Sequence, residues 1–459
     1  MNESAHPIKG QLARIASLTG IDKAVAYSAG SRVVAAVSGV ASIFFISLCL
    51  SEEQQGFYFT FGSIVALQVF FELGLTNIIT QFVSHEYAHI KEGERGSEKN
   101  MSRLAHLLRF SVKWYAVASA LYMIFILGAG FWFFNRYSPN ADSSVWMIPW
   151  LLVTAISALN LFLSVILALL KGVDKVTEVS KIVFWQQLLM PLAIWTGLLC
   201  GLGLYVVGIG YSVSFLCACV LLWKEGLFKP LKDLWRVAVV EKVNYAKEIF
   251  PYQWRISLSW ASGYFVFQLF NPVLFATSGP VAAGQMGMTL AALNGISAFA
   301  SSWIDTKVPL LSNMIALKRF RELDRIFHRI GLQLTAICAM LLILFIAFVE
   351  IMDFAGLSLA KRFLPFWPLL FMSGAILANQ VGNCWATYLR CHKREPLLVN
   401  SLVGAVSCGV STIVLGKYFG AVGIAAGYFA LRVILSAWNY LVYVDKKKEW
   451  HCSREEIEE

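Results

Sequence analysis

Arg432 lies near the centre of the last long apolar run of the chain, where a buried charge is costly and therefore marks a candidate functional residue. If this run is a helix, Tyr428, Ser436 and Asn439 share the face of Arg432, because residues four and seven apart lie on one side. A guanidinium in such a polar stripe can face an aqueous cavity that receives an anion, or it can sense an electric potential. It can also bind backbone carbonyls of a neighbouring helix, and the sequence leaves these interpretations open.

Two carboxylates and a second arginine lie in other apolar runs. Glu72 is flanked on its helical face by Gln68 and Thr76, and Arg32 lies about one turn inside the first run. If the first two runs are antiparallel neighbours, Arg32 and Glu72 fall at similar depth and can form an internal ion pair. Alternatively, Glu72 binds an exchangeable proton or cation. Asp305, near the end of a later run, is a second candidate for such ion coupling.

One apolar run carries amide, hydroxyl and aromatic side chains at three- and four-residue steps, which places them on one helical face. Amides bond to hydroxyl groups and aromatic rings cover the apolar faces of pyranoses, so the stripe suits recognition of a glycan. The alternative is packing between helices through polar side chains. Arg255, near one end of this run, could bind a phosphate or extend along its own stem to the polar boundary. The stripe comprises Gln253, Ser257, Trp260, Tyr264, Gln268 and Asn271.

Further uncharged polar residues lie on single faces of later runs. Asn294 belongs to one of these stripes, and Gln380 and Asn383 belong to another. Because the stripes come from several runs and contain few charges, they predict a wet central cavity more than a set of ion sites. The candidate substrate-binding residues are therefore the three arginines Arg32, Arg255 and Arg432 together with these amides and the stripe described above.

The sequence predicts neither a metal site nor a cofactor. His85 and His89 are four residues apart, but no third ligand follows at a metal-type spacing, which favours a solvated face. Cys217 and Cys219 lie two residues apart and face different ways on a helix, so the cysteines are expected to be small core residues. The chain has no phosphate-cradling P-loop and no GxSxG sequence, and it is not expected to be an enzyme.

The elements that carry these residues are apolar runs long enough to cross a bilayer. Hydrophobic residues make up 58% of the chain, charged residues 14%, and the mean hydropathy is +0.64. A soluble domain would carry about 25% charged residues. The sequence therefore predicts an all-α polytopic membrane protein with about 12 transmembrane helices, at residues 28–50, 57–83, 110–134, 145–170, 182–201, 204–223, 252–276, 281–303, 328–349, 363–389, 397–418 and 421–443.

Lysine and arginine residues lie in every second gap between these runs. The net charge is +10, yet of the 38 lysines and arginines only Arg136, Lys361, Arg362 and Lys417 occupy the intervening gaps. Basic loops stay on the cytoplasmic side of a membrane, so the pattern predicts that both termini are cytoplasmic. The positive charge is expected to meet anionic membrane lipids, and no nucleic-acid partner is predicted.

A basic, amphipathic segment over residues 224–250 divides the chain near its middle and is expected to lie on the inner headgroup layer as a helix. It separates an N-terminal six-helix lobe, residues 1–223, from a C-terminal six-helix lobe, residues 251–445. Residues 446–459 are expected to form a cytoplasmic tail. An even number of spans in each lobe makes the two repeats parallel and places a central cavity between them.

Two stretches resemble a known family. They are EQQGFYFTFGS from Glu53 to Ser63, continued by ALQVFFELGL to Leu75, and GQMGMTLAALNGISAFASSWIDTKVP from Gly284 to Pro309. Both resemble the bacterial oligosaccharide-lipid flippases of the multidrug/oligosaccharidyl-lipid/polysaccharide exporter (MOP) superfamily, and the likeness extends over nearly the whole chain through the twelve-span, two-lobe plan. Family members do not tie their cavity bases to a fixed motif, so the resemblance transfers no functional residue.

The resemblance implies a flippase that moves an undecaprenyl-diphosphate-linked oligosaccharide, such as an O-antigen unit of lipopolysaccharide, across the bacterial inner membrane. Its cavity would open alternately to each side, and glycosyltransferases and a glycan polymerase of the same pathway would be partners. The first alternative is a cation-coupled multidrug antiporter of the same superfamily, which needs a membrane carboxylate such as Glu72 or Asp305. The second is a membrane glycan polymerase or ligase, which would need a large external loop.

Overall fold

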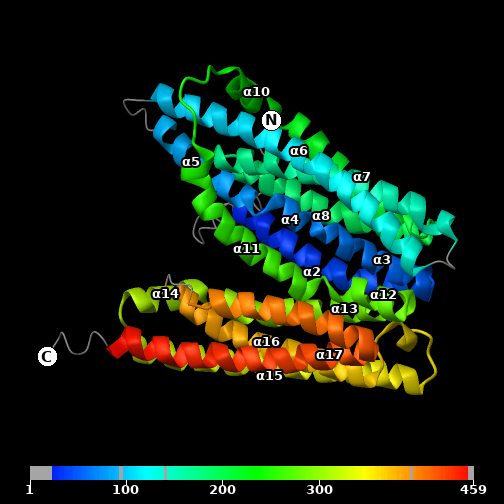
Figure 1. Ribbon diagram of the computed structural model, residues 1–459. Coiled ribbons are helices and arrows are strands. Elements are labelled where there is room, and N and C mark those ends of the chain that lie inside the picture. The colour runs from blue at the N-terminus through cyan, green and yellow to red at the C-terminus, as the bar shows by residue number, and fades with distance from the viewer. Residues whose placement is uncertain (1–22, 92–96, 139–141, 393–395, 453–459) are drawn as a thin grey trace, which may run out of the picture. The chain divides into compact units, whose positions relative to one another are not determined.

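A computed structural model describes residues 23–91, 97–138, 142–392 and 396–452, and all regular elements within these ranges are helices (Figure 1). Seven of the helices are long and apolar enough to cross a membrane, so the chain is a multi-pass membrane protein. They are α2 (Lys23–Cys49), α6 (Ser97–Tyr137), α7 (Ser143–Gly172), α8 (Val176–Leu199), α9 (Tyr205–Lys224), α15 (Phe320–Phe354) and α17 (Leu398–Cys452).

The other predicted runs are helical in the structure but do not all form single spans. They correspond to α3 (Glu52–Val65), α4 (Val69–Glu72), α5 (Leu75–Lys91), α11 (Phe250–Phe267), α12 (Phe270–Ser278), α13 (Pro280–Asp305) and α16 (Phe366–Cys391). Three short elements lie in the connections: α14 (Val308–Ala316) and the 3-10 turns η1 (Ala66–Gln68) and η3 (Ala360–Arg362). Counting the bent pair α3–α5 as one span gives eight candidates. The full twelve-span layout stays a prediction.

The run predicted at residues 57–83 is broken, which its hydropathy does not indicate. Leu73 has φ 50° and Gly74 has φ 64°, so the backbone leaves the right-handed helix between α4 and α5, and the two parts are bent by 41°. The run predicted at 252–276 is also interrupted, between Phe267 and Phe270. The last two predicted runs are confirmed as two helical segments, both within α17, which meet at Gly420, whose φ of 56° and ψ of −138° are not helical.

The prediction of a helix over the whole linker, residues 224–250, is wrong. Only α10 (Phe228–Arg236) is an α-helix, and the chain from Val237 to Asn244 has no helical turn. A π-helix, η2 (Tyr245–Ile249), then leads into α11. The interruption has a cause in the packing, because backbone groups of Val237, Val240, Glu241 and Val243 are bonded to side chains of α6.

The described chain packs as two compact units. Unit 1 is Met1–Ser38, Gly74–Leu127 and Ile148–Trp254, and unit 2 is Gly39–Leu73, Gly128–Met147 and Arg255–Glu459. An aliphatic cluster forms a core in unit 1, and its buried members are Leu163, Leu170, Val179, Ile182, Ala218, Leu222 and Leu227. The lobe boundaries expected from the sequence, 1–223 and 251–445, are untested by this division and stay a prediction.

Unit 2 contains a close approach of α3 to α13. A Cβ atom added at Gly56 would lie 1.9 Å from the carbonyl oxygen of Pro280, so only glycine allows this contact. Beside it, the buried Gln55 donates from Nε2 to the backbone oxygens of Gly284 (2.8 Å) and Arg362 (3.0 Å). The Arg362 guanidinium in turn donates to the carbonyl of Leu50 at 2.6 Å. These bonds tie α3, α13 and η3 together at one end of unit 2.

Candidate functional site

A cavity of about 240 Å³ lies within unit 2, between α11, α16 and α17. Its polar lining combines two guanidinium groups with amides and hydroxyls, and no carboxylate occurs among the lining residues that the structure describes. Charge in the cavity is therefore positive, and hydrogen-bonding groups surround it. The polar lining residues are Ser262, Asn379, Asn383, Arg390, Asn400, Ser401, Arg432 and Asn439.

Arg432 projects from α17 into this lining between two aromatic rings. The carbon of its guanidinium lies 5.0 Å from the ring centre of Tyr428 and 5.7 Å from that of Phe267. Cation–π contacts of this kind stabilise a partly desolvated arginine by about 0.5–2 kcal/mol and leave its N–H groups available for other acceptors. Arg432 is thus held in place without a carboxylate partner among the lining residues described.

The amides are arranged by bonds along and between the helices. Asn400, near the start of α17, donates to the backbone oxygen of Leu435 at 3.2 Å and to the side-chain oxygen of Asn439. Ser436, one turn after Arg432, donates to the backbone of Ala378 on α16 at 2.7 Å. These contacts join the segments of α17 before and after Gly420 to each other and to α16, and they fix the orientation of the face that carries Arg432.

Several predicted binding residues direct their polar atoms into the protein instead. Gln380 donates to the backbone of Ser297 on α13 at 2.8 Å. The hydroxyl of Ser257 donates to Leu73, the residue at which α4 ends, at 2.8 Å. Three further members of the stripe are buried: Asn271 donates to Ser63 at 3.1 Å, Gln253 accepts from Tyr245, and Tyr264 packs on Phe70 with ring centres 5.5 Å apart.

The remaining candidates lie at helix surfaces or helix ends. Trp260 on α11 and Asn294 on α13 are exposed, and Gln268 lies in the break between α11 and α12. Arg32 is exposed, in the part of α2 that belongs to unit 1, and Arg255 lies on α11 with its side chain outside the described part. Glu72 is the last residue of α4, directly before the break at Leu73, and Asp305 is the exposed last residue of α13.

Of the predicted binding residues, the structure brings Arg432 and Asn383 together in the cavity. Asn379, Asn400 and Ser262 were not predicted. A signal for Asn379 exists, because positions 379, 383, 386 and 390 follow the i, i+4, i+7, i+11 spacing of one helical face. Gln380 is rotated by about 100° from Asn379, which turns it toward α13 instead of the cavity.

Residues His85 to His89 spell HEYAH, an HExxH sequence, although the prediction above weighed only the histidine pair. In zinc proteases the glutamate of this motif is the general base. Here the carboxylate of Glu86 is buried and accepts a hydrogen bond from Nε of Arg103 at 2.8 Å. Among the described residues no three potential metal ligands come together. The carboxylate that would act as the base is thus engaged in an ion pair.

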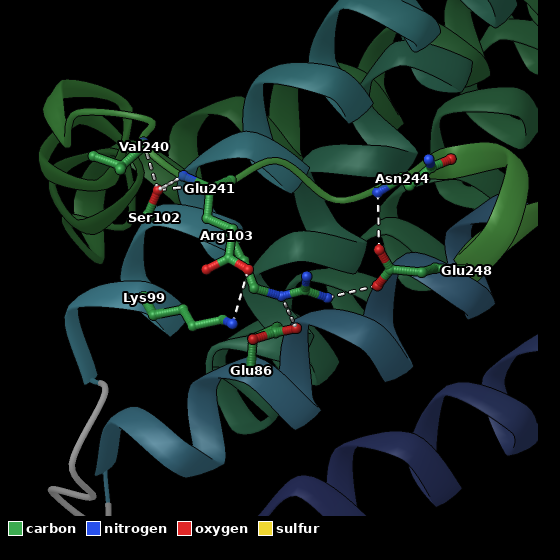
Figure 2. Close-up of polar contacts among 8 residues, drawn as sticks. All are labelled: Glu86, Lys99, Ser102, Arg103, Val240, Glu241, Asn244 and Glu248. Atoms are coloured by element: carbon green, nitrogen blue, oxygen red, sulfur yellow. Dashed lines mark hydrogen bonds and ion pairs between the residues drawn. The ribbon is translucent and has the colours of Figure 1, made fainter.

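Arg103 connects three elements of unit 1 (Figure 2). From α6 it reaches Glu86 on α5 and, at 2.6 Å, the carboxylate of Glu248 on η2. Burial works to raise the pKa of Glu248, but the hydrogen bond from the Asn244 N–H and the bond and charge of Arg103 outweigh it, so the pKa is lowered. Glu248 is thus held ionised and fixes the start of η2.

Comparison with known proteins shows similarity in structure only. No family model matches the chain, and no curated protein matches it in sequence. An inward-facing multidrug resistance MATE family transporter of the MOP superfamily superimposes with a TM-score of 0.57 at 14% identity, covering 91% of this chain and 99% of that one.

Two further solved structures give similar values. The lipid II flippase MurJ, in an inward closed conformation, has a TM-score of 0.54 at 12% identity and covers 91% of this chain and 87% of its own. The MATE multidrug transporter DinF-BH has a TM-score of 0.53 at 10% identity, with coverage of 94% and 96%. At these identities the comparison establishes architecture alone. The chain therefore has the fold of the transporters and flippases of the MOP superfamily.

Proposed function

We propose that this protein is a flippase for lipid-linked oligosaccharides, and that it moves an undecaprenyl-diphosphate-linked glycan between the leaflets of a bacterial cytoplasmic membrane. The observation that carries the proposal is the charge of the unit 2 cavity. Two arginines and four asparagines line it, and its described lining contains no carboxylate. A cavity of this kind favours an anion that also presents hydroxyl groups.

The chemistry of the proposed substrate matches each part of the lining. A diphosphate accepts several hydrogen bonds from a guanidinium, and arginine is suited to such planar, bidentate recognition. Asparagine side chains donate to and accept from sugar hydroxyls. The polyprenyl chain stays in the lipid phase. The solved structure of a lipid II flippase has the same fold, which is consistent with a lipid-linked substrate.

In this proposal the protein works by alternating access, with both termini in the cytoplasm. Glycosyltransferases supply the lipid-linked unit and a polymerase removes it on the other side, so product removal helps to set the direction. Arg432 and Arg390 bind the diphosphate, and Asn383 and its neighbouring amides contact the glycan.

A second candidate function is cation-coupled export of drugs. It is favoured by the position of Glu72, a carboxylate beside the break between α4 and α5, because interrupted helices in transporters commonly form ion sites. Two of the similar structures are multidrug transporters. An exporter of cationic drugs would have to overcome the positive charge of the unit 2 cavity, so we rank this function second.

Both functions are tested by one reconstitution. Purified protein is placed in vesicles that contain a fluorescent undecaprenyl-diphosphate oligosaccharide, and the fraction reached by a membrane-impermeant quencher is followed with time. A parallel set of vesicles measures uptake of a cationic dye under a proton or sodium gradient. We expect flipping of the lipid and no gradient-driven dye uptake. Dye uptake that is lost in Glu72→Gln, without flipping of the lipid, would replace the first proposal by the second.

A further inference from the structure

The short helix α10 has three distinct faces. At 100° per residue, Leu227, Leu231 and Leu234 lie on one side, and the packing against the core of unit 1 includes Leu227 and Leu231. Next to this side come Phe228 and Trp235, whose side chains are 47% and 40% exposed. The third face is basic and comprises Lys229, Lys232 and Arg236, all exposed.

The positive charge of this basic face is not neutralised by salt bridges among the described residues. Within the described part of the chain, no salt bridge involves Lys229, Lys232 or Arg236. Asp233 is the single acidic residue within the helix. Three exposed bases against one carboxylate leave a net positive surface beside two exposed aromatic rings.

The helix is fixed to the protein in a defined orientation. The guanidinium of Arg109 on α6 donates to the carbonyls of Trp235 (2.5 Å) and Val237 (2.8 Å) and lies 5.9 Å from the ring centre of Trp235. The segment after the helix is held too, because the backbone N–H groups of Val240 and Glu241 both donate to the hydroxyl of Ser102 (Figure 2). The basic face is therefore presented by a rigid support.

The position of α10 in the chain places this face beside a bilayer. The candidate span α9 ends at Lys224, and α10 begins four residues later at Phe228. Trp223, 74% exposed at the end of α9, is of the type found where spans leave the hydrocarbon. A helix that starts one turn after a span must lie within the headgroup region or at its edge.

We propose that α10 is a binding surface for anionic phospholipid headgroups. The lysines and the arginine contact lipid phosphates, while Phe228 and Trp235 insert at the boundary between headgroups and acyl chains. The exposed rings favour a lipid over a soluble acidic partner, because they flank the bases on the side that continues toward the apolar face. Since Arg109 and Ser102 connect α10 and the chain after it to α6, a bound lipid stabilises the linker as a unit. The proposal is independent of which substrate the protein transports.

The test uses the full chain in nanodiscs made of phosphatidylcholine, with or without phosphatidylglycerol. The variant K229Q/K232Q/R236Q is compared with R136Q/K361Q/K417Q, which removes the same number of positive charges from the sparsely charged loops. Lipid retained by the protein is counted by native mass spectrometry, and thermal unfolding is recorded in parallel. We expect the α10 variant to bind phosphatidylglycerol on the order of 100-fold more weakly, because each of the three bases near an anionic surface contributes about 1 kcal/mol, a factor of roughly five.

Wild type and the loop variant should gain the same thermal stability when phosphatidylglycerol is added, and the α10 variant should gain less while unfolding normally in phosphatidylcholine. Binding should weaken as salt is raised. Equal retention of phosphatidylglycerol by the α10 and loop variants would overturn the proposal. So would equal stabilisation of wild type by inorganic phosphate or by an acidic peptide in phosphatidylcholine discs, since the surface would then recognise a soluble anion.

Discussion

The charge of Arg432 is stabilised by its surroundings without being neutralised by them. Two aromatic rings hold the guanidinium, whereas the cavity lining around it supplies amides and a second arginine. A carboxylate partner would have accepted hydrogen bonds from the guanidinium N–H groups and neutralised its positive charge. With aromatic partners, the donors and the positive potential both stay available to an incoming anion.

We predict that Arg432→Ala lowers the rate of lipid flipping on the order of 10- to 100-fold, the range for losing a hydrogen bond to a charged group. Arg432→Lys should recover part of the rate, because it keeps the charge but not the planar pair of donors. Lys417→Ala, on the same helix but outside the cavity lining, should flip lipid at the wild-type rate. Quencher access in reconstituted vesicles measures all three. A fully active Arg432→Ala protein would exclude this role.

The sequence pattern predicted part of the cavity lining, because helical periodicity shows which residues share a face but not which face meets the cavity. Arg432 was predicted because a charge in an apolar run is conspicuous in any sequence. Gln380 was predicted for its polarity but bonds to Ser297 on α13, while its neighbour Asn379 lines the cavity. A shift of one residue turns a side chain by about 100°, and only the packing of three helices decides which of two adjacent amides faces the cavity.

At the scale of elements, the segment after α10 is held by side chains of α6 and not by its own backbone. Ser102 bonds the N–H groups of residues 240 and 241, His106 accepts from the N–H of Val243 at 3.3 Å, and Arg103 holds Glu248. This explains why an apparently continuous amphipathic segment is not one helix. The sequence alone showed its amphipathic pattern but not that α6 offers competing partners 137–145 residues away.

We predict that Glu248→Gln lowers the stability of the protein near neutral pH by on the order of 1 kcal/mol, because Arg103 loses one of two partners in a partly exposed ion pair. The pKa of Glu248 is lowered in the folded state, so its contribution is present above the ordinary value of 4.5 and is lost as the pH falls through the folded value. The difference between variant and wild type should therefore disappear in acid.

Thermal unfolding in detergent from about pH 7 to about pH 3 measures this difference. The matched control is Glu241→Gln, which removes the more exposed pair with Lys99 and should change stability little at any pH. A gap between Glu248→Gln and wild type that persists unchanged into acid would show that the amide disturbs packing and that the ion pair is not its cause.

A second prediction at this scale concerns the contact of α3 with α13. Gly56→Ala should lower stability by roughly 1–3 kcal/mol, since its Cβ would meet the Pro280 carbonyl and force the helices apart. Gly62→Ala on the same helix meets no atom within 4 Å and should be neutral or slightly stabilising. Thermal unfolding of both variants tests the contact. Equal stability of the two would mean that α3 does not approach α13 in this way.

For the whole molecule, composition and run length were sufficient to predict an all-helical, multi-pass protein, and the resemblance to the MOP superfamily agrees with the observed fold. The break after Glu72 was not predictable, because Leu73 in a left-handed conformation has no counterpart in hydropathy, whereas the break at Gly420 lies in the gap predicted between residues 418 and 421. Seven helices of the described chain qualify as spans individually, and α13 and α16 are not among them. Whether these two cross the membrane decides between the twelve-span plan and a smaller one.

We predict that α13 and α16 both cross, because the gaps at their two ends differ in basic charge as the other gaps do. The nine cysteines are first replaced, and single cysteines are introduced at Ser278, Lys307, Lys361 or Leu398, near the ends of the two helices. A membrane-impermeant maleimide added outside intact cells should label positions 278 and 361, and positions 307 and 398 should react only after the membrane is opened. Ser278→Cys and Lys361→Cys thus serve as the accessible controls for the other two. Labelling of both ends of either helix from the same side would mean that this helix does not span the bilayer, and the predicted cytoplasmic location of the basic loops would then fail with it.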